Sequence, residues 1–254
     1  MSEDEAPGQV RKATRCRGPE EADFRVAPLL LLADGRFPAG GHAHSGGLEA
    51  AAAADRVHDP ITLEGFLEGR LATNGLTSAA FAASACAAAA RTFRGPGIPA
   101  RFHELDHELT ARTPAPALRA TSRKLGRQLL RAARAASPDP LLDALTTAWS
   151  EGPHQPLVLG ATAQAFGLTP HAAAAAALHE AATGPATAAV RLLGLDPFAV
   201  HALLAHLAPQ LDALSHQAAA LVDEPPSELP ASGAPLLDIS AEHHATWEVR
   251  LFAS

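Results

Sequence analysis

The chain has 254 residues, of which 47% are hydrophobic and 19% are charged, and its formal net charge is −7. This composition excludes an intrinsically disordered chain and is sufficient for one large domain with a sizeable core. The acidic balance argues against nucleic acid as a partner, because nucleic-acid binding needs basic patches that displace counterions.

Alanine is abundant, tyrosine is absent and aromatic residues make up only 4% of the chain. Alanine has the highest helix propensity, whereas strands favour β-branched and aromatic residues. We therefore predict an all-α fold, a single-domain helical bundle of about eight to ten helices.

The cysteine pattern and the lengths of the apolar runs both bear on where in the cell the protein works. Cys16 and Cys86 form no C-x-x-C pair, so neither a disulfide framework nor a metal site is indicated. The N-terminal residues lack the apolar core of a signal peptide, and the apolar runs fall short of the about 20 residues that span a bilayer. We expect a cytoplasmic protein that does not contact a membrane.

Residues 1–22 are charged and lack periodicity, which predicts a disordered leader before an all-helical domain over residues 23–223. Residues 224–254 are proline-rich and predict a flexible, extended tail with an adhesive end. Within the domain we expect helices over residues 23–33, 62–76, 77–93, 100–112, 115–136, 138–149, 154–166, 169–193 and 197–222, and one more after Ser45.

Several helix starts have a capping signal. Thr169-Pro170 and Asp196-Pro197 each combine an N-cap residue with proline at the first helical position. Ser45 can cap the helix that follows a glycine-rich segment, residues 34–47, which we call the glycine loop.

Glycine and proline also predict interruptions. We expect a break between two helices near Asn74-Gly75 and a kink at Pro209. Residues 225–238 contain too many prolines for a helix.

The segment His103–His107 reads H-E-L-D-H. On a helix, His103 and His107 lie on one face, and Glu104 could act as general base in a zinc metallopeptidase. A chance match is plausible among 13 histidines, and Thr110 stands where a longer metallopeptidase pattern has glycine. A zinc metallopeptidase is therefore kept only as an alternative.

The glycine loop offers a second candidate for metal chemistry. His42 and His44 could bind nickel, which would make the chain a nickel carrier. No cysteine or carboxylate is adjacent. The favoured interpretation is therefore a structural loop whose small residues let another backbone segment approach closely. We predict no metal site.

Other catalytic and nucleotide-binding motifs are absent. Ser45 is not in a G-x-S-x-G elbow, because Ala43 occupies the first glycine position. Neither a P-loop nor a dinucleotide fingerprint occurs, so nothing requires a cofactor. The basic residues within 119–134 predict a solvated face or a docking surface for an acidic partner.

The glycine loop and its flanks resemble the urease accessory protein UreF family, in a pattern D-x-x-F-P-x-G-x-x-x-H-S-x-G-L-E. Three further blocks match in order: residues 104–131, residues 154–196 and the end of the tail. The resemblance covers about residues 23–254 and is carried in the loop by Asp34, Phe37, Pro38, Gly40, His44, Ser45, Gly47, Leu48 and Glu49.

This resemblance implies a non-enzymatic, all-α homodimer that bridges UreD (also called UreH) to the GTPase UreG and regulates GTP-dependent nickel insertion into apo-urease. It implies docking of the tail on UreD through Arg250, Leu251 and Phe252, and control of the GTPase through Arg191.

Gly126, Arg127 and Gln128 match a further block of the family pattern and are implied partner-binding residues. The chain departs from many relatives in two places: His42 and His44 stand in the loop, and the sequence LLGLD follows Arg191.

Overall fold

The computed structural model describes residues 25–92 and 98–252. These residues form α-helices joined by turns and by longer segments, and no β-strand occurs among them, which confirms the all-α prediction. The predicted leader, residues 1–22, lies outside the described residues. No helix in the described part is long and apolar enough to cross a membrane.

The core is built by three helices rich in small residues: α4 (Leu76–Thr92), α8 (Gln155–Ala165) and α9 (Pro170–Leu193). A Cβ on Gly160 of α8 would lie 2.2 Å from the carbonyl oxygen of Ala82 on α4. The alanine content therefore does more than favour helix: it lets the central helices approach closely.

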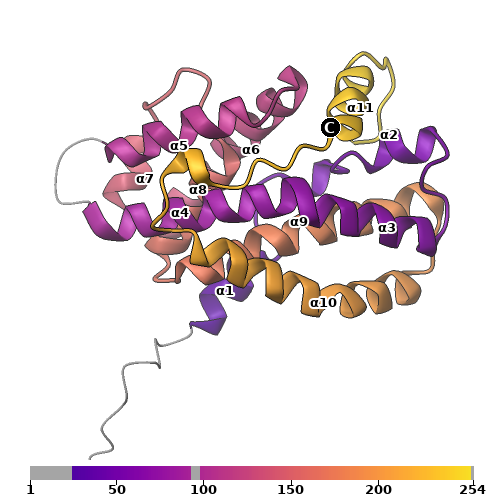
Figure 1. Cartoon of the computed structure of the whole chain (residues 1–254), viewed down its shortest axis with the longest axis horizontal. Coiled ribbons are helices and arrows are strands. Elements are labelled where there is room, and N and C mark those ends of the chain that lie inside the picture. The colour runs from indigo at the N-terminus through magenta and orange to yellow at the C-terminus, as the bar shows by residue number, and fades with distance from the viewer. Residues whose placement is uncertain (1–24, 93–97, 253–254) are drawn as a thin grey trace, which may run out of the picture.

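The remaining helices surround this core (Figure 1). Helix α10 packs on α9 and α4, helix α6 packs on α8, and α11 lies against α6 and α2. Their bounds are α1 Val26–Ala33, α2 Leu48–Ala53, α3 Pro60–Arg70, α5 Ala100–Ala111, α6 Pro116–Ala136, α7 Pro140–Leu145, α10 Pro197–Ala220 and α11 Pro235–Ala245.

The predicted caps of the two longest helices are confirmed. Thr169 Oγ1 accepts a hydrogen bond from the amide of Ala172 at 3.2 Å, and Asp196 Oδ1 accepts one from Phe198 at 3.1 Å. Helix α10 continues through Pro209 to Ala220.

The predicted break at Asn74-Gly75 is wrong. The helical path continues from α3 through a π-helical segment, Leu71–Gly75, directly into α4. Gly75 is buried, and a Cβ there would lie 3.2 Å from the carbonyl oxygen of Arg70 and 3.5 Å from Leu178. Close packing, rather than a turn, explains this glycine.

The prediction that residues 225–238 contain no helix is also wrong. A short 3-10 turn, Pro226–Glu228, is followed by α11, which begins at Pro235 with this proline at its first position. Proline is favoured there because the amide it lacks would have no helical partner. Whether the tail is flexible in solution stays a prediction.

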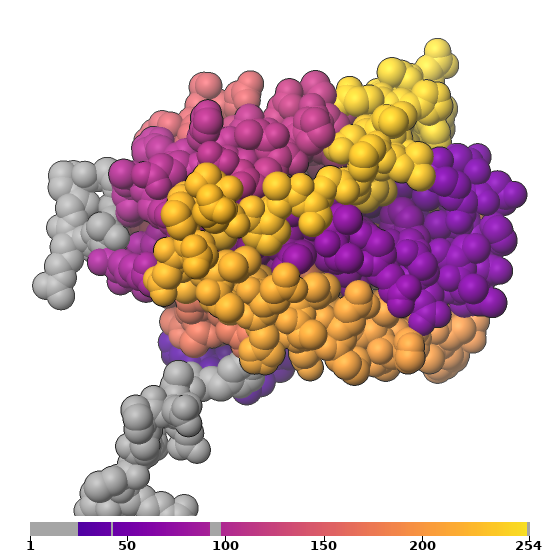
Figure 2. All heavy atoms as spheres, in the orientation of Figure 1, coloured from indigo at the N-terminus to yellow at the C-terminus, as the bar shows by residue number. Residues whose placement is uncertain are grey.

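The segment between α10 and α11 crosses one face of the body (Figures 1 and 2). Arg112, the C-cap residue of α5, holds it by donating hydrogen bonds to three carbonyl oxygens. These belong to Ser227, Leu229 and Pro230, at 2.8, 3.2 and 3.2 Å. The crossing brings α11 next to α2 and the glycine loop.

Candidate functional site

The glycine loop needs glycine where its backbone turns. Gly40 has φ +84° and Gly47 has φ +91°, a region that other residues rarely adopt. A Cβ on Gly40 would lie 2.0 Å from Oε1 of Gln128, and one on Gly47 would lie 3.1 Å from Leu237 of α11. The structure thus joins two predicted site residues, Gly40 and Gln128, which are far apart in the chain.

Helix α2 follows the loop and carries a buried carboxylate. Gly47, not the predicted Ser45, occupies the N-cap position. Ser45 is fully buried, and its Oγ accepts a hydrogen bond from the amide of Glu49 at 3.3 Å. Leu48 is fully buried in the core, and Glu49 is only 8% exposed. A carboxylate buried this far requires hydrogen-bond donors.

The donors to Glu49 come from the end of the chain. Oε1 accepts from the amide of Leu251 at 2.8 Å, and Oε2 accepts from the amide of Phe252 at 3.0 Å. Nε2 of His244, a fully buried residue of α11, lies 2.9 Å from Oε2. The loop helix therefore holds the tail by its backbone through hydrogen bonds to a carboxylate, which are stronger than neutral ones.

A second contact fixes the side chain of Phe252. The guanidinium carbon of Arg191, in the last turn of α9, lies 5.7 Å from the centre of the Phe252 ring, within range of a cation–π interaction. Phe252 is 9% exposed and lines a cavity of about 290 Å³ together with Phe37 and His44. We call the set Glu49, Arg191, His244, Leu251 and Phe252 the tail anchor.

Apolar side chains near the tail anchor point to solvent. Val249 is 83% exposed and Leu251 is 76% exposed. On α11, Leu236 and Ile239 are three residues apart, share a face and are also exposed. The tail is thus anchored by two backbone amides and by the Phe252 ring, while several of its other apolar side chains remain exposed.

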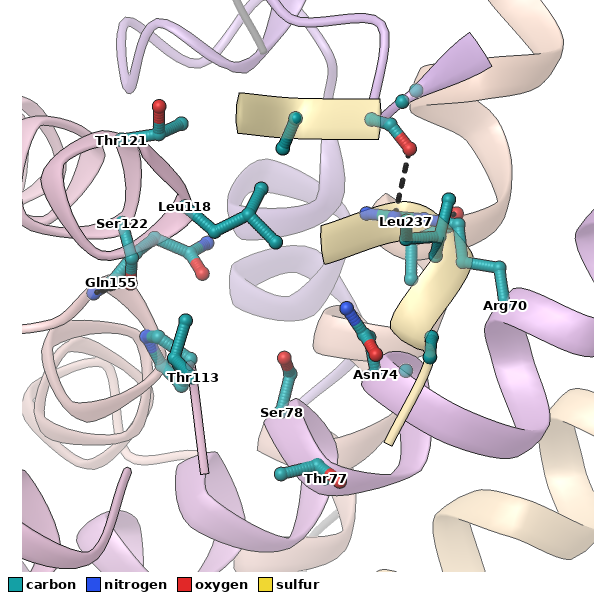
Figure 3. Close-up of a pocket in the computed structure, with 18 of the residues that line it drawn as sticks. Arg70, Asn74, Thr77, Ser78, Thr113, Leu118, Thr121, Ser122, Gln155 and Leu237 are labelled. Carbon is teal, nitrogen blue, oxygen red and sulfur yellow. Dashed lines mark hydrogen bonds between the residues drawn. The ribbon is translucent and has the colours of Figure 1, made fainter. Parts of the chain in front are cut away.

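A pocket of about 220 Å³ is lined by residues of the glycine loop and of α11, among them Leu237 (Figure 3). Arg70 of α3 borders it and donates to the carbonyl oxygens of Gly46 at 2.8 Å and Ala181 at 3.2 Å. Asn74, Thr77, Ser78, Ser122 and Gln155 also line it. Arg70 therefore ties the loop to α9.

A carboxylate also borders this pocket. Nε2 of Gln155 donates to Oε2 of Glu180 at 2.7 Å. Burial raises the pKa of Glu180 above its usual range, against the opposing effects of Gln155 and Arg70, and burial lowers the pKa of Arg70. The hydroxyl of Thr77 has no hydrogen-bond partner among the described residues.

The block at Gly126 has a packing role in the structure. A Cβ on Gly126 would lie 2.0 Å from the carbonyl oxygen of Pro153, so the glycine lets α6 approach the start of α8. Arg127 is exposed and donates to the carbonyl oxygen of Glu151. Pro38 and Arg250 are exposed as well.

A buried polar network connects α5, α6 and α8. Arg123 donates to both carboxylate oxygens of Asp106, at 3.1 and 2.9 Å. His154 is fully buried between hydroxyl groups, with Nε2 3.1 Å from Oγ1 of Thr110 and Nδ1 3.0 Å from Oγ of Ser122. Burial, followed by the charge of Arg123, lowers the pKa of His154 to about 4. This pKa makes His154 a poor base for activating Ser122.

The H-E-L-D-H segment lies on α5. His103, Glu104 and His107 are exposed, and the ring of His103 packs 5.2 Å from that of Trp149. In the part of the chain that the structure describes, no group of three or more His, Cys, Asp or Glu side chains is placed to hold a metal ion. The side chain of His42 lies outside that part, and His44 is 9% exposed.

Sequence reasoning missed three residues that hold the site together: Arg70, His244 and Glu180. Each acts across a long sequence separation, as in the contact between His244 and Glu49. The pair His243-His244 was visible in the sequence, but only the fold shows that His244 is buried and His243 exposed.

Fold and site together define an all-helical protein whose C-terminal segment is bound by the helix that follows a glycine-rich loop and presents exposed apolar side chains. The sequence profile of the UreF family matches residues 57–208. The chain belongs to the UreF family.

Relatives named urease accessory protein UreF agree with this assignment. One from Mycolicibacterium vanbaalenii is 41% identical over 230 residues, which covers 90% of this chain and 99% of the relative. One from Mycobacterium marinum is 42% identical over 230 residues, with the same coverage of both chains. One from Mycobacterium tuberculosis is 38% identical over 232 residues, again with the same coverage.

Proposed function

We propose that this chain is a non-catalytic scaffold in the nickel-dependent maturation of urease in the cytoplasm. In this proposal it bridges UreD/UreH and the GTPase UreG, works as a homodimer and regulates GTP-dependent nickel insertion into apo-urease. Family membership supports the urease context.

One observation carries the proposal: Glu49 of the family pattern binds the backbone amides of Leu251 and Phe252. Residues assigned to partner binding by resemblance, at opposite ends of the chain, thus form one structural unit. The tail is fixed where its apolar side chains are accessible, which supports docking of UreD on the exposed residues Val249 and Leu251.

Arg191 offers a second surface. It is exposed in the last turn of α9, and its guanidinium lies over the ring of Phe252. A planar guanidinium can also bind carboxylates, so Arg191 is suited to contact UreG. Its contact with Phe252 would make this interaction depend on the position of the tail. The contact of Arg191 with Phe252 supports coupling between the two partners.

The test is co-purification with UreD when the two proteins are expressed together. Glu49→Ala removes the acceptor for the backbone amides of Leu251 and Phe252, so we expect the tail to detach. The yield of complex should then fall to the level of a chain lacking residues 250–254. Glu68→Ala is the control, because Glu68 is exposed on α3, lies outside the tail and has no ion pair among the described residues.

Circular dichroism of the chain alone establishes that each variant keeps its helices. Full recovery of UreD by both the Glu49→Ala variant and the shortened chain would contradict the proposal. A nickel-dependent urease assay in cells then measures whether loss of the complex also lowers maturation.

A further inference from the structure

Helix α6 has an unusual charge composition. Its 21 residues include no aspartate or glutamate, although the whole chain has a net charge of −7. Its cations are Arg119, Arg123, Lys124, Arg127, Arg131 and Arg134.

Two of these cations are paired within the fold. Arg123 points inward and binds the buried carboxylate of Asp106, and Arg134 forms an ion pair with Asp143 at 2.7 Å. Lys124, Arg127 and Arg131 are exposed, and no carboxylate of the described residues lies within 4.0 Å of them. We call these three residues the α6 stripe.

The α6 stripe is a single row. Its members are spaced by three and four residues, so they lie on one face of the helix along roughly 10 Å. The opposite face packs on α8 and α7, where Gly126 brings the backbones together. Arg127 is further fixed by its hydrogen bond to the carbonyl oxygen of Glu151. The row is therefore held on a rigid element.

We propose that the α6 stripe docks an acidic face of a protein partner. Three cations at this spacing complement carboxylates on one face of a partner helix, and arginine binds such groups through two parallel hydrogen bonds. The net charge of −7 opposes general attraction to polyanions, so a local match to a protein surface fits better than nucleic acid or membrane. Taking this partner from the urease maturation proteins rests on the proposed function.

The test compares two single charge reversals with the same net charge. Arg131→Glu changes the α6 stripe but keeps Arg127 and its contact. Arg91→Glu changes an exposed cation elsewhere, which is paired with the surface residue Asp223. Affinity for purified UreD, UreG and apo-urease is measured separately, at low and at high salt.

We expect one of these proteins to bind the α6 variant roughly tenfold or more weakly than the wild type at low salt, and the difference to shrink at high salt. The control should bind like the wild type. Equal affinity of both variants for all three proteins would overturn the proposal. Binding to duplex DNA and to anionic vesicles is measured in parallel, and a loss of affinity seen only with one of these would overturn it as well.

Both variants keep the tail, which separates this proposal from the bridging function. If the chain lacking residues 250–254 still binds UreD, the tail mechanism fails while the α6 result stands. If tail loss abolishes the complex and α6 reversal changes nothing, only the present inference fails.

Discussion

Gly126→Ala is expected to destabilise the fold, although alanine is the better helix former. In the interior of a helix this change gains about 1 kcal/mol. At Gly126, however, the new Cβ would lie 2.0 Å from the carbonyl oxygen of Pro153 and 3.1 Å from the amide nitrogen of Gln155. Both obstacles are backbone atoms, so α6 and α8 must separate.

The size of the effect follows from the required shift. Real Cβ contacts essentially never fall below 3.0 Å, so a contact of 2.0 Å requires a movement of about an ångström between two packed helices. Overpacking of this kind costs about 1–3 kcal/mol, at the upper end when backbone must move. We expect a net loss of about 2 kcal/mol, or a decrease in Tm of about 4–8 °C for a chain of this length.

Gly65→Ala is the matched control. Gly65 lies in the interior of α3, is exposed, and a Cβ there would meet no atom within 4 Å. This variant should gain about 1 kcal/mol, so the two substitutions have opposite signs. Thermal and urea unfolding followed by circular dichroism measure both. A Gly126→Ala variant as stable as the wild type, but unable to bind partners, would refute the packing role and restore a direct partner contact.

Two further predictions concern the buried network. Because the pKa of His154 is lowered to about 4 from 6.5, the unfolded chain binds the proton more tightly, and stability contributed by neutral His154 is lost as pH falls from about 6.5 towards 4. The loss is about 2 kcal/mol at a pH of about 5, and urea unfolding of His154→Gln at several pH values should show a correspondingly flatter profile. Asp106→Ala leaves Arg123 buried without its carboxylate and should cost about 3–5 kcal/mol, whereas Asp106→Leu/Arg123→Met should cost clearly less. Equal losses from the single and double variants in the same assay would contradict this view of the pair.

Local chemistry explains which parts of the fold were predictable from sequence. The start of α9 depends on Thr169 and Pro170, which are adjacent, so the sequence contains the whole signal. Gly75 and Pro235 were misread because their local preferences have two outcomes. A glycine can mark a turn or a close contact, and a proline can end a helix or begin one. For Gly75, packing against Leu178 decides between the two outcomes. For Pro235, the position of α11 beside the glycine loop decides.

The same distinction applies to the site. Family resemblance marked Glu49 and Phe252 separately, but their hydrogen bond spans most of the chain and has no local signature. His244 was missed for this reason, since its neighbour His243 has the same residue type and a different environment. Gly126 was marked as a partner-binding residue by the same block, whereas the carbonyl of Pro153 gives it a packing reason.

Glu49 holds the end of the tail through backbone amides rather than through side chains. Its hydrogen bonds to Leu251 and Phe252 reach only their backbone amides, so within the tail anchor the contact of Arg191 with the Phe252 ring is the part that depends on a side chain at the chain end. The side chains of Val249 and Leu251 stay exposed. Under the proposed function, a tail already held in place loses less conformational entropy on docking than a free one, which strengthens binding without any added contact.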